Sequence, residues 1–133
     1  MERVTKKKLI EELRLCAEKI LTETEIDKKI FILDISSDLI GSYLLFEEKN
    51  EDLILAELIL DVCRGTIVVS LEEESYKRTL LSNISELLDE IAKKILELTV
   101  NMEKEQPIFP PLIKIVVITH SITKHGIYST LKK

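Results

Sequence analysis

At 133 residues the chain has room for one hydrophobic core, and we expect residues 1–133 to form a single domain. Apolar residues make up 45% of the chain but aromatic residues only 5%, so the core must be built from Ile, Leu and Val. The net charge of −5 argues against nonspecific nucleic-acid binding, although the lysines at 6–8 and at 132–133 leave a local basic patch open.

The first predicted element is an amphipathic helix over residues 9–21. Its apolar residues recur at intervals of three and four, as one helical stripe requires. They are Leu9, Ile10, Leu13, Cys16, Ala17, Ile20 and Leu21. The polar residues 22–29 form a predicted connector. A continuous apolar run at 30–33 then predicts a strand buried on both faces, with Asp34 near its end.

Two further strands are predicted in the next part of the chain. The turn-forming residues 36–38 separate the first strand from a second strand at 41–46. A charged turn at 47–52 follows. Residues 53–62 are apolar at almost every position and fit either a strand or a helix. We favour a strand, because an antiparallel meander is the simplest connection after a hairpin.

A fourth strand and a long helix are predicted after Arg64 and Gly65, which punctuate the chain. Residues 66–71 are rich in β-branched side chains and predict the strand. The acidic residues 72–74 suit the first turn of a helix, where negative charge meets the positive end of the helix dipole. A continuous apolar stripe then predicts a helix over residues 75–102. Its members are Leu80, Leu81, Ile84, Leu87, Leu88, Ile91, Ala92, Ile95 and Leu98.

The end of the chain begins with three prolines, at 107, 110 and 111, which terminate any continuation of the long helix. Residues 112–119 are mostly β-branched and apolar and predict a last buried strand. The tail at 121–133 fits either a helix or a strand.

The predicted order of elements is therefore α-β-β-β-β-α-β-α. It describes an α/β domain with a single mixed, largely antiparallel sheet of about five strands. The N-terminal helix and the one long helix pack on this sheet. Helices of about 15 and 27 residues exceed what one sheet covers, so apolar helix surface is left over and we expect a dimer interface.

Asp34 is the strongest candidate for a catalytic residue. In the RNase H-like architecture a strand-borne aspartate helps to bind catalytic metal, and such nucleases need several carboxylates converging on two cations. Here the last strand ends in Thr119 and His120 rather than in an acid, and residues 72–74 lie at the other end of the helix. We interpret Asp34 as a turn or capping acid and keep a metal-dependent nuclease as the alternative.

Histidines and glycines offer no second candidate. His120 and His125 are five positions apart, without a third metal ligand nearby or a nucleophile in a known motif. Gly41, Gly65 and Gly126 are isolated, so no phosphate-binding glycine loop is predicted. We predict no catalytic, cofactor-binding or metal residue, and a protein that is not an enzyme.

Cysteine content and hydropathy indicate where the protein works. Cys16 and Cys63 are too few and too far apart for a metal knuckle, and we interpret both as small buried hydrophobic residues. No apolar run approaches the roughly 18 residues that span a bilayer, and the start is polar. We expect a cytoplasmic protein that does not enter the membrane. Its many charges and few amides are typical of hyperthermophiles.

In outline the chain resembles the central domain of Pelota and of the archaeal and eukaryotic class-one peptide release factors. The matching stretches are 30–46 (IFILDISSDLIGSYLLF), 53–59 (LILAELI) and 113–131 (IKIVVITHSITKHGIYSTL). This resemblance implies an α/β domain associated with translation. Where release factors carry a Gly-Gly-Gln tripeptide, this chain has residues 63–66 (CRGT), so peptidyl-tRNA hydrolysis is not implied.

The chain is similarly close to the small proteasome-assembly chaperones, which also place a strand meander before a long helix, a strand and a short helix. Those chaperones work as heterodimers through apolar faces. Our leading hypothesis is a non-enzymatic interaction module that acts as a dimer or as a subunit of a larger assembly. Its partner is expected to be a protein or a second copy, with nucleic acid contacted only through an assembly such as the ribosome.

Overall fold

The structure, a computed structural model, describes the backbone of residues 4–47, 50–72 and 78–131, and these residues form helices only. The helices are α1 (Lys6–Thr22), α2 (Ile26–Leu44), α3 (Glu51–Glu72), α4 (Arg78–Glu103) and α5 (Phe109–Leu131). The predicted α/β fold with its sheet of about five strands is therefore wrong, because every predicted strand lies within a helix or its final turn.

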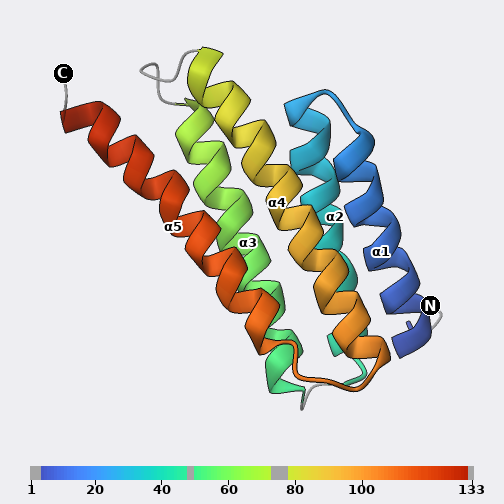
Figure 1. Ribbon diagram of the computed structural model, residues 1–133. Coiled ribbons are helices and arrows are strands. Elements are labelled where there is room, and N and C mark those ends of the chain that lie inside the picture. The colour runs from blue at the N-terminus through green and yellow to red at the C-terminus, as the bar shows by residue number, and fades with distance from the viewer. Residues whose placement is uncertain (1–3, 48–49, 73–77, 132–133) are drawn as a thin grey trace.

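The five helices of the described chain run alternately up and down (Figure 1). Helix α1 packs against α2 and α4, α2 packs against α3, and α5 packs against both α3 and α4. A smaller contact joins α2 to α4. Consecutive helices are antiparallel, whereas α3 and α5 run in the same direction side by side. The start of α1 and the end of α5 lie at opposite ends of the bundle.

One apolar cluster that draws on all five helices forms the core. It is aliphatic, as the composition predicts. Its largest fully buried side chains are Leu9, Leu13, Ile20, Leu33, Ile40, Leu60, Ile67, Ile84, Leu88, Ile91, Ile95 and Leu98. The predicted helix at 9–21 is confirmed by α1, and the one at 75–102 is confirmed by α4 from Arg78 on, because residues 75–77 lie outside the described residues. The buried residues of the two helices include most of the stripes that predicted them.

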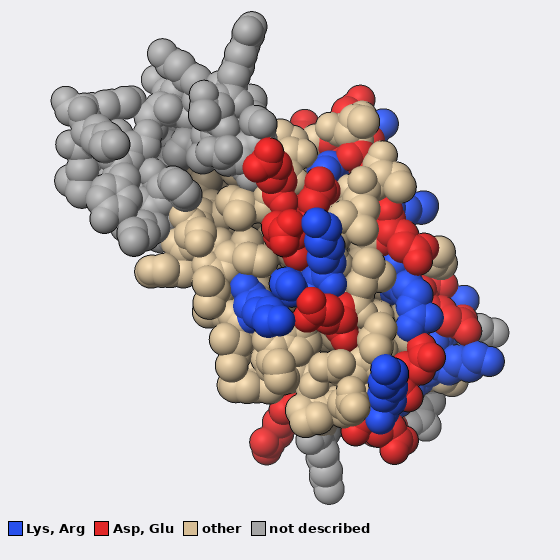
Figure 2. Space-filling model, viewed as in Figure 1, with Lys and Arg blue, Asp and Glu red and all other residues tan. Residues whose placement is uncertain are grey.

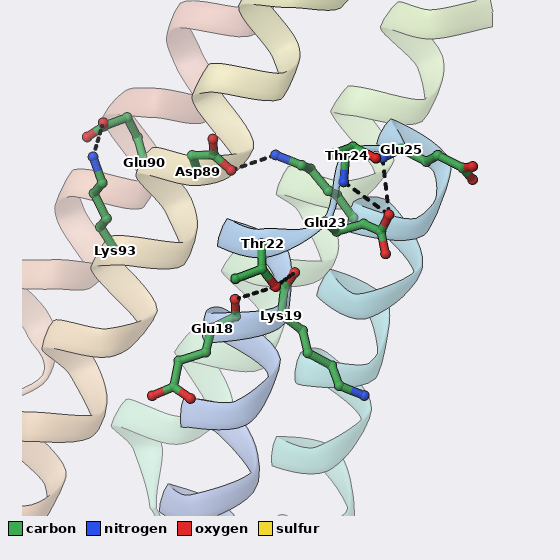
Figure 3. A network of polar contacts seen from close by, with 10 residues as sticks. Glu18, Lys19, Thr22, Glu23, Thr24, Glu25, Asp89, Glu90 and Lys93 are labelled. Atoms are coloured by element: carbon green, nitrogen blue, oxygen red, sulfur yellow. Dashed lines mark hydrogen bonds and ion pairs between the residues drawn. The ribbon is translucent and has the colours of Figure 1, made fainter.

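Helix α1 is closed by local polar contacts at both ends. The Thr5 hydroxyl accepts a hydrogen bond of 3.1 Å from the backbone N–H of Lys8, which caps the helix at its start. In the connector at 23–25 the Glu23 carboxylate accepts from the N–H groups of Thr24 and Glu25, at 3.0 and 3.2 Å (Figure 3). These two backbone hydrogen bonds lower the pKa of Glu23. The connector fixes the turn between antiparallel α1 and α2.

Helix α2 contains the predicted strand at 30–33 and most of the one at 41–46, together with the predicted turn at 36–38. The serines of that turn are compatible with a helix because their hydroxyls find partners. Ser36 donates to the carbonyl of Ile32 at 3.1 Å, one turn back. Ser37 donates to the carbonyl of Glu57 on α3 at 3.4 Å, which links the two helices.

Helix α3 runs through the predicted strands at 53–62 and 66–71, and through Arg64 and Gly65 between them. For residues 53–62 the helix, which was the open alternative, is correct. Buried residues recur at intervals of three and four, as a helix requires. They are Leu53, Ala56, Leu60, Cys63, Ile67 and Ser70. The β-branched character of 66–71 is overridden by packing against the bundle.

Helix α5 contains the predicted strand at 112–119 and continues to Leu131, so the tail is helical to that residue. The prolines have two different effects here. Helix α4 ends at Glu103 ahead of Pro107, as predicted. Pro110 and Pro111, however, lie in the first turn of α5, where an N–H group has no helical partner and proline is tolerated.

Candidate interaction surface

The predicted nuclease residue Asp34 lies on α2, not at the end of a strand. Its Oδ1 atom is 3.1 Å from Nε of Arg64 on α3, and Nη2 of Arg64 is 3.6 Å from Oδ1 of Asp61. Arg64 thus lies between two carboxylates and ties α2 to α3. The strand on which the nuclease hypothesis places Asp34 is absent, because Asp34 lies in a helix.

The other residues considered as ligands are His120, His125 and the acids at 72–74. His120 is exposed on α5, and the side chain of His125 lies outside the described residues. Glu72 is the last residue of α3 rather than the first of a helix, and residues 73–74 are not described. No group of three His, Cys, Asp or Glu side chains in the described part of the chain is placed to hold a metal ion.

The two cysteines are free and buried, as predicted. Cys63 on α3 contacts Thr119 on α5, and burial raises the pKa of its thiol to about 11 although the hydrogen bond with Thr119 lowers it. Burial also raises the pKa of Cys16. Cys63 and Thr119 thus face each other where α3 and α5 pack side by side.

Helix α3 is apolar on its outer side as well as on its inner side. Ile54, Leu58 and Val62 recur every four residues and are 46%, 58% and 55% exposed. Val69 continues the row and is 57% exposed. A helix that is apolar on all sides is normally buried on all sides. The outer row of α3 is apolar but is exposed in the described structure.

Helix α5 repeats this pattern beside α3. Phe109, Ile113, Val116 and Val117 are each about half exposed. Lys114 points toward α4, where its Nζ atom lies 3.7 Å from Oε2 of Glu97. The outer side of the described part of α5 therefore presents apolar groups together with the exposed His120, and Lys114 lies at the edge toward α4.

The outer rows of α3 and α5 together form what we call the α3/α5 face. Its members are Ile54, Leu58, Val62, Val69, Phe109, Ile113, Val116 and Val117. The two rows lie on helices that pack against each other. Figure 2 shows charged side chains gathered over α1 and α4 and a broad area almost free of them over the described part of α5. The face is a large exposed apolar patch, the kind of surface that marks a contact with another molecule.

The sequence signal of this face is visible in retrospect. We predicted surplus apolar helix surface and a dimer interface, but from the two predicted helices, which are α1 and α4. Most of the described residues of their apolar stripes are buried, with Leu13, Ile84 and Leu88 fully inside the core. The surplus lies on α3 and α5, where apolar residues at almost every position predicted buried strands instead.

Hollows also lie elsewhere on the described part of the molecule. A groove of about 600 Å³ between α1 and α2 has Leu15 and Phe31 among its apolar residues and a rim of mixed charge. A smaller hollow of about 350 Å³ at one end of the bundle is lined by Tyr43, Asn50 and Gln106 among others. The groove contains exposed apolar residues outside the α3/α5 face, which makes it a useful control surface.

Comparison of the chain with protein-family models, with curated proteins and with solved structures finds no match. The α/β fold implied by the two resemblances is not the fold of the described residues. Association with translation and assembly-chaperone activity stay predictions from the sequence. None of the helices formed by the described residues is both long enough and apolar enough to cross a bilayer.

Proposed function

We propose that this protein is a non-enzymatic interaction module that works as a dimer or as a subunit of a larger assembly. The observation that carries the proposal is the α3/α5 face, a row of half-exposed aliphatic residues on each of two adjoining helices. Leaving such a patch in water has a cost of about 25 cal/mol for each Å² of apolar surface. A protein partner that presents an apolar, weakly charged helical surface would remove that cost.

Charge supports a protein as the partner. The chain carries a net charge of −5, and the α3/α5 face itself consists of uncharged residues. Nucleic acid is bound chiefly through Lys and Arg contacts to phosphates, which this face does not supply. The face instead has the composition of an interface core, in which apolar side chains replace charged ones.

The proposal is tested by the native size of the protein in an extract of the cells that produce it. We expect the wild-type chain to elute from a sizing column well above the 15.3 kDa of one chain. Leu58→Glu and Val117→Glu should shift it toward the monomer, because each places a charge inside the interface. Leu15→Glu, in the groove between α1 and α2, is the matched control and should leave the size unchanged. Equal elution of all four proteins would contradict the proposal.

A further inference from the structure

Gly65 has no role within its own chain that would explain a glycine. It lies inside α3, and no glycine of the described chain has a positive φ. A Cβ atom built at Gly65 meets no described atom within 4 Å. Glycine in a helix interior costs about 1 kcal/mol relative to alanine. The bundle therefore gives up stability at this position without gaining space that it uses.

Gly65 is placed where a partner would use that space. It follows Val62 by three residues and precedes Val69 by four, so it lies in the outer row of α3. Two helices can approach most closely where one of them has no side chain. The outer row of α3 is an apolar ridge, and Gly65 leaves a gap in it that we call the notch.

We infer that the α3/α5 face is covered by a second copy of this chain, whose α3 crosses this α3 at Gly65. The inference rests on the function proposed above and names the partner. A two-fold dimer requires one patch that is complementary to itself. A mostly apolar ridge with a central notch meets this requirement, because the notches of the two copies face each other. In an antiparallel crossing, Val62 of each copy then lies within one residue of the level of Val69 of the other, and Asp61 lies level with that Val69.

The available area is close to what such a dimer needs. Eight side chains about half exposed leave on the order of 700 Å² of apolar surface, and a standard interface buries about 800 Å² from each partner. The two-fold arrangement also keeps like charges apart. Asp61 lies four residues from Gly65, so two antiparallel copies place their Asp61 residues about 12 Å apart along the helix, beyond the Debye length of about 8 Å.

The test is sedimentation velocity of the purified full chain from about 1 to 100 µM, a range that detects micromolar dissociation constants. We expect twice the mass of one 15.3 kDa chain. Val62→Glu should weaken association by more than about a hundredfold, and Phe31→Glu, a control on the exposed side of α2, should not. A wild-type chain that stays monomeric throughout, or equal effects of the two variants, would overturn the inference.

Gly65→Ala makes the test specific for the crossing point. The added methyl group should raise the dissociation constant about tenfold or more, because overpacking a close contact costs about 1–3 kcal/mol. In the Val62→Glu background, where the chain is a monomer, the same change should raise the melting temperature through helix propensity. If Gly65→Ala leaves the dimer affinity unchanged, the two α3 helices do not cross at Gly65. The purified chain could be a monomer while the complex in cell extract is still lost with Val117→Glu. That result would show that the partner is not a second copy, and the proposed function would stand.

Discussion

The ammonium group of Lys29 on α2 lies 2.6 Å from Oδ1 of Asp89 on α4, and 4% of the lysine side chain is exposed against 34% of the aspartate side chain. The cation is therefore buried and the anion reaches water. This asymmetry decides which partner matters more, because an unpaired buried charge is costly whereas an exposed carboxylate remains solvated.

Asp89→Asn should accordingly destabilise the bundle more than Lys29→Met does. We expect a loss of about 2–4 kcal/mol for Asp89→Asn, which leaves the buried ammonium without its counter-ion. Lys29→Met keeps an unbranched apolar chain in the same place and should cost less than about 1.5 kcal/mol. Urea unfolding followed by circular dichroism measures both. A larger loss of stability for Lys29→Met than for Asp89→Asn would contradict this expectation.

Gly41 on α2 should respond to alanine differently from Gly65. A Cβ atom at Gly41 would lie 2.9 Å from Oε1 of Glu57, the mobile end of a side chain on α3. We expect Gly41→Ala to change stability by less than about 0.5 kcal/mol, because the helix-propensity gain is offset by displacement of that carboxylate. In a Glu57→Ala background the gain should approach about 1 kcal/mol. A double-mutant cycle from urea unfolding gives the difference; strict additivity would exclude the contact.

Acid should weaken the ion pairs that Glu97 of α4 makes with Lys94 in the same helix and with Lys114 on α5. Glu97 accepts a hydrogen bond of 2.9 Å from Lys94 and lies 3.7 Å from Lys114, and the hydrogen bond from Lys94 is the main reason why the pKa of Glu97 is lowered from 4.5. A lowered folded-state pKa gives stability that is present above about pH 4.5 and is lost as the pH falls through the folded-state pKa.

The advantage of wild type over Glu97→Gln in melting temperature should therefore be present at neutral pH and shrink below about pH 4.5. Thermal unfolding across this range measures it. Glu86→Gln, another exposed acid of α4, is the control for a general charge effect. An advantage that stays constant down to about pH 3 would mean that Glu97 contributes through something other than its charge.

The thiol of Cys63 should be inert in the folded protein. It is fully buried, and with a pKa of about 11 its thiolate fraction near pH 8 is about one in a thousand. Cys16 is 8% exposed and lines the groove between α1 and α2, so it should react first. Mass spectrometry after timed maleimide treatment gives the order, with protein in denaturant as the control. Faster labelling of Cys63 would indicate that α3 and α5 separate in solution.

Sequence reasoning succeeded where the outer side of a helix is charged. In α1 and α4, residues such as Glu11 and Lys93 lie outside while Leu13 and Ile91 lie inside, so the helical period is visible in the apolar residues. These two helices were predicted with boundaries close to those observed. The aliphatic core and the burial of the cysteines follow from composition in the same way.

It failed for α2, α3 and α5 because exposed apolar residues fill the gaps in the period. Phe31 is 64% exposed yet stands between Ile30 and Ile32, so the run has the appearance of a buried strand. Leu58 and Val117 have the same effect in α3 and α5. Local sequence patterns are expected to mislead where residues serve a contact outside the chain. The residues that concealed the α3 and α5 helices are those that form the α3/α5 face.

The odd number of helices in the described chain separates the beginning of α1 from the end of α5 by the length of the bundle (Figure 1). A helix of 23 residues is about 35 Å long, which sets the scale of that separation. Fluorophores attached near the two ends would report bundle length directly, and a short linker could not join them for circular permutation. Force applied between them would pull α1 and α5 along their axes, so the bundle would resist by shearing rather than by peeling.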